Sequence, residues 1–342
     1  MDASSRGKCS LTELPGTGGA GGLPPDVPGT VVTVGTFDGV HRGHWAVLRE
    51  IGERARRRRL TSVLVTFDRH PLTVVRPEAA PPILTSPDEK KEILALSSLD
   101  YVAFLAFDRT LSLYQPEEFV RLVLVDRFRV KELVVGYDHG FGRDRTGDRK
   151  TLRRLGAELG FEVDVVSPVT ANGSRVKSSK IRELVRCGEV ERAAGALGRP
   201  YSLRGVVVHG LGRGRQLGFP TANLQVPEGG KLVPGSGIYA VRASLGWRIC
   251  DGLLHLGPRP TFAGSPPSIE LYLLDFENDI YGESVRVDFL SRLRDVRPFA
   301  SAEELVRQMR VDREQAMRFF AERARRDGDL WTGDEDEGGR GR

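Results

Sequence analysis

Two histidines in a glycine-rich segment could stabilise charge on a phosphate. His41 and His44 stand three residues apart, where an apolar run over residues 31–34 gives way to a helix-like stretch. Ligands of parallel sheets bind beyond the carboxyl ends of the strands, and a helix N-terminus presents N–H groups and a positive dipole to an anion. We therefore predict that both imidazoles face the phosphate oxygens of a nucleotide. A metal site or a structural pair is the alternative, but no HExxH pattern supplies a third ligand.

Other residues could complete this phosphate site. Gly35 and Gly39 precede the histidines, and glycine permits close approach of the backbone to a ligand. Far along the chain, Ser178 and Arg182 are four residues apart, so they share one face if a helix begins there. The serine would then lie near the helix N-terminus, where anions bind. Taken alone, this second pattern favours ordinary helix capping.

A second glycine cluster precedes a short polar motif. Gly210, Gly212 and Gly218 match neither a Walker loop nor GxGxxG, and clustered glycines usually indicate a turn. Thr221 and Asn223 follow, two residues apart, and would project from the same side of an extended chain. Hydroxyl and amide oxygens suit Mg²⁺, which takes few protein ligands and keeps several waters.

The surrounding elements predict two folded domains between two unstructured ends. Strand-like runs at 31–34, 62–67, 101–107, 133–135 and 161–166 alternate with helix-like stretches, which is typical of a parallel sheet covered on both faces. Later runs at 203–208, 238–243, 249–256, 269–276 and 285–289 are separated by turns and predict an antiparallel barrel, followed by a terminal helix. Capping boxes at Ser86 to Glu89 and Ser301 to Glu304 mark two helix starts. We expect a flexible leader at 1–28, an α/β domain at 29–187, a linker at 188–199, a barrel domain at 200–327 and a flexible tail at 328–342.

Four motifs of the first domain resemble those of FAD synthetases. They are residues 35–44, 66–71, 135–147 and 178–182. The first also resembles the HxGH signature of the nucleotidyltransferase superfamily, which implies a Rossmann-like nucleotidyltransferase domain. By this resemblance His41, His44 and Arg182 are catalytic, and ATP is bound by Gly35, Phe37, Asp38, Gly39, His41, His44, Ser178 and Arg182. The resemblance also implies that Asp138 and Phe141 bind the flavin. The chain departs from the family pattern at His139 and Lys177.

The second domain resembles riboflavin kinases through the GFPTAN motif at 218–223. The resemblance implies that Thr221 and Asn223 hold Mg²⁺ and ATP, and that Gly210, Gly212 and Gly218 cover the ATP phosphates. It also implies that Glu270 is the catalytic base, accepting the proton of the flavin 5′-hydroxyl. Without the matches around it, Glu270 would be read as a surface residue of an alternating strand. His255 and Val296 depart from the family pattern.

Together these resemblances identify a bacterial bifunctional riboflavin kinase and FMN adenylyltransferase. Such an enzyme phosphorylates riboflavin to FMN with ATP, then adenylylates FMN to give FAD and pyrophosphate, with Mg²⁺ as cofactor and FMN and FAD as product ligands. In-line attack on a phosphorus needs charge stabilisation more than a protein nucleophile. One alternative is a nucleotidyltransferase for another phosphate acceptor. Another is a flavin-binding regulatory module that binds RNA through the basic run at 54–59.

Composition is consistent with an intracellular enzyme of small-molecule substrates. The 342 residues carry a formal charge of +5, with 51 basic and 46 acidic residues, which is a weak bias and does not by itself imply nucleic acid. We interpret the basic run at 54–59 as a solvated helix face. Three scattered cysteines support neither disulfides nor zinc, and no apolar run approaches the length of a membrane span. We therefore expect a cytoplasmic protein without a membrane partner, and a homo-oligomer stays open.

Overall fold

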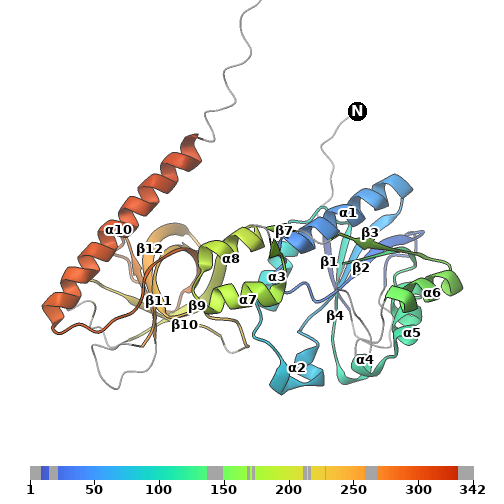
Figure 1. The fold of residues 1–342 in the computed structure, drawn as a ribbon, viewed down its shortest axis with the longest axis horizontal. Coiled ribbons are helices and arrows are strands. Elements are labelled where there is room, and N and C mark those ends of the chain that lie inside the picture. Colours follow the sequence, from blue (N-terminus) through green and yellow to red (C-terminus); the bar gives the residue numbers. More distant parts are fainter. Residues whose placement is uncertain are drawn as a thin grey trace, which may run out of the picture. The chain divides into compact units, whose positions relative to one another are not determined.

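The computed structural model is shown in Figure 1. It describes residues 9–14, 22–136, 149–167, 170–171, 174–210, 214, 217–227, 229–258 and 268–329. The chain divides into two compact units. Unit 1 comprises residues 1–182, 196–198 and 229–232, and unit 2 comprises residues 183–195, 199–228 and 233–342.

Unit 1 contains a six-stranded sheet in which every strand pair is parallel. Its strands are β1 (Ser10–Leu14), β2 (Thr30–Val34), β3 (Thr61–Phe67), β4 (Tyr101–Leu105), β5 (Val130–Gly136) and β6 (Glu162–Val166), in the order β1-β4-β3-β2-β5-β6. The chain leaves β2 toward β3 on one side and later returns to β5 on the other, so the strand order reverses at β2. Ligands of doubly wound sheets bind at the carboxyl end of such a strand. The predicted parallel sheet is confirmed.

Helices pack on both faces of this sheet, which is why β2 is buried along its whole length. The helical segments of unit 1 and of the stretch that follows are α1 (Arg42–Arg58), α2 (Leu72–Val75), η1 (Pro77–Ala79), α3 (Pro87–Leu94), α4 (Arg109–Leu113), α5 (Pro116–Phe119), η2 (Val120–Val125), α6 (Arg149–Leu159), α7 (Ser178–Arg186) and α8 (Val190–Leu197). Val31 faces the core beneath α1, whereas Val32 faces the core beneath α6. A short antiparallel pair, β7 (Thr170–Ala171) and β8 (Ser174–Arg175), precedes α7.

The predicted capping box starts α3 as expected. Ser86 Oγ accepts from the Glu89 N–H at 3.2 Å, and the Glu89 carboxylate accepts from the Ser86 N–H at 2.9 Å. Pro87 fills the first helical position, where no hydrogen-bonding N–H is needed.

The structure corrects the expectation of an unstructured leader for part of residues 1–28. Ser10–Leu14 forms β1, which adds to the edge of the sheet beside β4. Closer to β2, the Arg129 guanidinium donates to the carbonyls of Leu23 and Pro24 at 2.8 and 2.7 Å. Contacts with β4 and with Arg129 therefore order these two segments, although their composition could not form a core of their own.

Unit 2 contains a closed antiparallel barrel, as the resemblance implied. Its strands are β9 (Tyr201–Val208), β10 (Ala222–Gln225), β11 (Gly237–Leu245), β12 (Arg248–Gly257), β13 (Ser268–Leu273) and β14 (Ser284–Arg294), and they close in the order β10-β13-β12-β11-β14-β9. The long helix α10 (Ala302–Asp329) packs beside β12 and β14 through Ala316 and Phe320 (Figure 1). Across the part of the chain that the structure describes, no helix is both long and apolar enough to span a bilayer.

Candidate active sites

His41 and His44 cap helix α1 reciprocally. Nδ1 of His41 accepts from the backbone N–H of His44, and Nδ1 of His44 accepts from the backbone N–H of His41, both at 3.3 Å. The two rings stack with their centroids 3.6 Å apart. Because Nδ1 is an acceptor in both rings, the hydrogen of each neutral imidazole is assigned to Nε2. Each ring therefore carries an Nε2–H donor, the group that a phosphate oxygen needs.

The turn before α1 adopts a backbone that most residues avoid. Phe37, Gly39 and Val40 have φ values of 48°, 83° and 35°, in the left-handed region. This conformation is costly for a bulky or β-branched side chain, and such strain is concentrated at functional sites. Burial of Phe37 and Val40 in the core beneath α1 holds the turn in place. At Gly39 a Cβ would also lie 2.9 Å from Cδ1 of Leu84, so glycine is needed there on two grounds.

Asp38 joins this turn to helix α7. The Arg182 guanidinium donates to the Asp38 carboxylate at 2.6 Å, and Ser178 Oγ donates to the Asp38 carbonyl at 2.9 Å. The carboxylate also accepts from the backbone N–H groups of Leu84 and Thr85. Ser178 and Arg182 thus converge from one helix, as their spacing predicted, and the residue on which they converge is Asp38.

Two further cationic or titratable side chains lie beside this ion pair. His70 feels the charges of Asp38, Arg182 and Lys90, and burial is the main reason that its pKa is lowered. Burial likewise lowers the pKa of Lys90 to about 8, while the negative charge of Asp38 opposes the shift. His70 was noted in the sequence only as part of the motif at 66–71, and Lys90 was not predicted as a site residue. Nothing in the sequence around Lys90 distinguishes it from a surface lysine of a short helix.

Some predicted residues of the first site cannot be placed. Asp138 and Phe141, expected to bind the flavin, lie outside the described residues. Gly35 directly follows β2, where its N–H donates to the Val65 carbonyl at 3.1 Å. All residues that were predicted to bind ATP in the first site lie within the described part of the chain.

Two arginines of the basic run at 54–59 pair with carboxylates. Arg54 contacts Glu132 and Asp164 at 2.6 Å, and Arg58 contacts Glu132 and Glu162 at 2.9 and 2.8 Å. These contacts raise the pKa of both guanidinium groups. Carboxylates within unit 1 therefore offset the charge of these two arginines.

The predicted kinase residues meet on neighbouring barrel strands. Thr221 Oγ1 donates to the Glu270 carboxylate at 3.2 Å, and Ser268 Oγ donates to its other oxygen at 2.9 Å. Asn223 on β10 is the direct cross-strand partner of Glu270 on β13. A Cβ at Gly210 would lie 1.9 Å from the Asn223 amide nitrogen, so glycine there lets the backbone approach that amide. Gly218 has a φ of 81°, and Gly212 lies outside the described residues.

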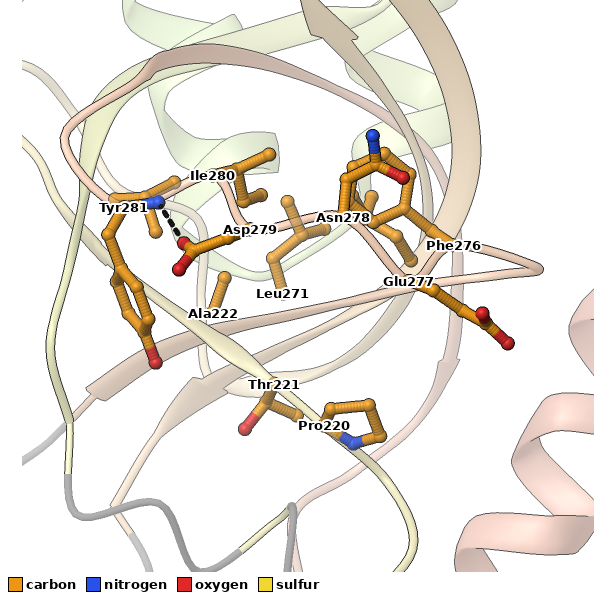
Figure 2. Close-up of a pocket in the computed structure, with 12 residues that line it drawn as sticks. Pro220, Thr221, Ala222, Leu271, Phe276, Glu277, Asn278, Asp279, Ile280 and Tyr281 are labelled. Carbon is orange, nitrogen blue, oxygen red and sulfur yellow. Dashed lines mark hydrogen bonds between the residues drawn. The ribbon is translucent and has the colours of Figure 1, made fainter.

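Thr221 also lines a pocket (Figure 2). It has an empty volume of about 550 Å³ including its mouth. Its lining combines the 220–222 segment with β13 and the loop after it, and Asp279 within that loop accepts from the Tyr281 N–H at 3.0 Å. The Tyr281 ring stacks on His209, with centroids 3.8 Å apart. The sequence did not predict that residues 279–281 line a pocket.

The donor set beside Glu270 fits a magnesium ion. Because the Thr221 hydroxyl donates its hydrogen to Glu270, its oxygen lone pairs remain for a cation. The Asn223 amide and the carboxylate supply further hard oxygen donors, which Mg²⁺ prefers. Within the described ranges no cluster of three His, Cys, Asp or Glu side chains is arranged to hold a metal.

Comparison with known proteins assigns each unit. A family model described as FAD synthetase matches residues 23–180, and one described as riboflavin kinase matches residues 197–320. A bifunctional riboflavin kinase/FMN adenylyltransferase of Escherichia coli strain K12 is 38% identical over 293 residues, covering 85% of this chain and 93% of that protein. This chain belongs to that bifunctional family. A Bacillus subtilis member is 33% identical over 298 residues, again covering 85% of this chain and 93% of that protein.

A solved structure has the same fold. It is titled a macrolide-efflux protein from Streptococcus pneumoniae, is 30% identical, and covers 89% of this chain and 98% of its own, with a TM-score of 0.76. Because the chain belongs to the bifunctional family, it is an enzyme of FAD biosynthesis with riboflavin kinase and FAD synthetase activities. The predicted function and the two predicted enzyme activities are confirmed.

Proposed function

We propose that the two activities divide between the two units, with adenylyl transfer in unit 1 and riboflavin phosphorylation in unit 2. The observation that carries this proposal is the presence of two separate polar constellations. One consists of His41 and His44 at the mouth of α1, and the other of Thr221, Asn223 and Glu270 on the barrel. We assign these activities to the domains expected from the sequence, at 29–187 and 200–327.

In unit 1, an FMN phosphate oxygen attacks the α-phosphorus of ATP and pyrophosphate leaves. Negative charge develops on the equatorial and leaving oxygens, so donors aimed at them lower the barrier. The Nε2–H groups of His41 and His44 serve as these donors. Arg182 and Ser178 hold Asp38 and thereby the turn on which the histidines stand. Asp138 and Phe141 bind the flavin by resemblance alone.

In unit 2, the riboflavin 5′-hydroxyl attacks the γ-phosphorus of ATP and ADP leaves. Glu270 accepts the hydroxyl proton, oriented by the hydroxyls of Thr221 and Ser268. Thr221 and Asn223 would hold Mg²⁺, which supplies positive charge to the phosphate oxygens when bound. ATP would occupy the pocket lined by Thr221. That Gly210, Gly212 and Gly218 cover its phosphates rests on the resemblance alone.

The substrates and setting follow from the same chemistry. Riboflavin, FMN and ATP are small molecules, so the proposed reactions need no nucleic-acid partner. All three cysteines are free, which suits a reducing compartment, so we place the reactions in the cytoplasm.

Substitution of Glu270 tests the division of labour. Glu270→Gln should abolish FMN formation from riboflavin and Mg-ATP, because the carboxylate base is replaced by an amide of the same shape. FAD formation from supplied FMN should persist at the level of the unsubstituted chain. Chromatography of the flavin products measures both. A folded variant that loses both reactions, or neither, would contradict the proposal.

A further inference from the structure

Lys90 is a buried cation that the chemistry above does not use. It lies on the short helix α3, and its residue is only 6% exposed. Its ammonium donates to two backbone carbonyls, that of Thr36 at 3.2 Å and that of Phe67 at 2.6 Å. Among the described residues, no carboxylate lies within ion-pair distance of it. The ammonium also lies over the Phe104 ring, 5.9 Å from its centroid. A buried ammonium without a paired carboxylate is costly, which suggests that Lys90 has a role.

The two carbonyls mark the ends of adjacent strands. Phe67 is the last residue of β3, and the segment after it leads to His70. Thr36 follows β2 and begins the turn that leads to His41. The Thr36 carbonyl also accepts from Thr66 Oγ1 at 3.2 Å, so both of its lone pairs are engaged. One ammonium therefore ties together the two segments that emerge at the carboxyl edge of the sheet.

We propose that Lys90 is a positioning residue for adenylyl transfer, whose ammonium fixes the turn carrying the histidines against the segment after β3. This inference rests on the proposed function of unit 1. Catalysis of this kind depends on donors held close to their required positions, and a displacement of about 1 Å can cost roughly 100-fold in rate. Loss of the ammonium would leave the Thr36 carbonyl, where the turn begins, held only by the Thr66 hydroxyl.

The charge state of Lys90 allows a test that distinguishes a positioning role in adenylyl transfer from a purely structural role. Because burial lowers its pKa to about 8, the ammonium loses its proton within an accessible pH range. The charged form dominates below that pH, so adenylyl transfer should fall as the pH rises through it. The charged or titratable groups that surround Lys90, from its own helix and from the segments packed on it, are Asp38, Asp68, His70, Glu89, Lys91 and Arg182.

Substitution by methionine removes the charge and keeps the length of the side chain. In the full chain, Lys90→Met should lower kcat for FMN adenylylation by about 10- to 100-fold, while riboflavin phosphorylation stays unchanged. Lys91→Met is the matched control, because Lys91 is the next residue, is also a lysine, and pairs at the surface with Glu13. It should leave both activities unchanged. Equal adenylylation rates for the two variants would overturn the inference.

A second variant covers the case in which Lys90→Met fails to fold. Lys90→Arg keeps a donor that stays charged to high pH, so its rate should persist where the unsubstituted chain and Lys91→Met decline, between about pH 8 and 9.5. An identical decline in Lys90→Arg would overturn the inference. Absence of any FMN adenylylation by the unsubstituted chain would instead overturn the proposed function, and the inference with it.

Discussion

The guanidinium of Arg182 donates to the carboxylate of Asp38 at 2.6 Å, and the two side chains are only 10% and 8% exposed. A buried charge that loses its partner keeps its desolvation penalty, so breaking such a pair is far more costly than breaking a surface pair. The pair fixes the turn before α1 to helix α7. Stability and adenylyl transfer should therefore fail together when it is broken.

The two partners should not be equivalent. Asp38→Asn leaves a buried guanidinium without a counter-charge and should cost about 3–5 kcal/mol in the free energy of unfolding. Arg182→Met should cost less, because the Asp38 carboxylate still accepts from the N–H groups of Leu84 and Thr85. Urea unfolding measures the order of the two. Arg154→Met, at an exposed surface pair, is the control and should leave the unfolding midpoint unchanged. The reverse order would show that Arg182, which also donates to the Pro82 carbonyl at 2.8 Å, is the better satisfied partner.

Capping and catalysis by His41 can be separated. Asparagine is a good N-cap residue, so the oxygen of His41→Asn can accept from the His44 N–H as the imidazole does. We expect its unfolding free energy to match that of the unsubstituted chain, whereas His41→Ala should lose about 0.5–2 kcal/mol. Both should lower FMN adenylylation by about 100-fold or more, because the Nε2–H donor is absent. Full activity in His41→Asn would show that the imidazole serves only as a cap.

The approach of Gly210 to Asn223 makes the kinase sensitive to one methyl group. Gly210→Ala would set a Cβ 1.9 Å from the Asn223 amide nitrogen, so the amide must move. Riboflavin phosphorylation should fall by about tenfold or more, while FMN adenylylation persists. The control is Gly246→Ala in the same barrel, where a Cβ meets nothing within 4 Å. Steady-state rates with riboflavin would reveal the difference, and equal rates for the two variants would count against a role for the Asn223 amide.

His70 should make unit 1 less stable in mild acid. Its pKa is lowered from the ordinary value of 6.5 because it is buried, so the unfolded chain binds a proton that the folded chain does not. Stability should therefore decline as the pH falls from about 6.5 through the folded-state value. His70→Asn keeps an acceptor for the Leu72 N–H and should show a shallower decline. Thermal unfolding between pH 5 and 7.5 compares the stability of the two chains. Parallel curves of stability against pH would show that His70 does not cause the decline.

Local patterns in the sequence predicted much of the architecture. Apolar β-branched runs marked β2 to β6, and the Ser86 to Glu89 capping box marked α3. The convergence of Ser178 and Arg182 followed from helical spacing. These predictions succeeded because each depends on residues that are close in the chain.

Features that depend on distant contacts could not be predicted. β1 has only five residues and is ordered by pairing with β4, some 90 positions away. The choice of Asp38 as the partner of Arg182, and the burial of Lys90, arise from tertiary packing. The reciprocal caps of His41 and His44 were also missed, because histidine is not among the usual N-cap residues.

The short strand β1 covers the edge of the sheet that β4 would otherwise expose. Three of its five residues, Ser10, Thr12 and Glu13, are polar, whereas β4 is the apolar run 101–105. An exposed, apolar edge strand is a template for intermolecular pairing. Removal of the residues up to Leu14 should therefore uncover that template and favour aggregation.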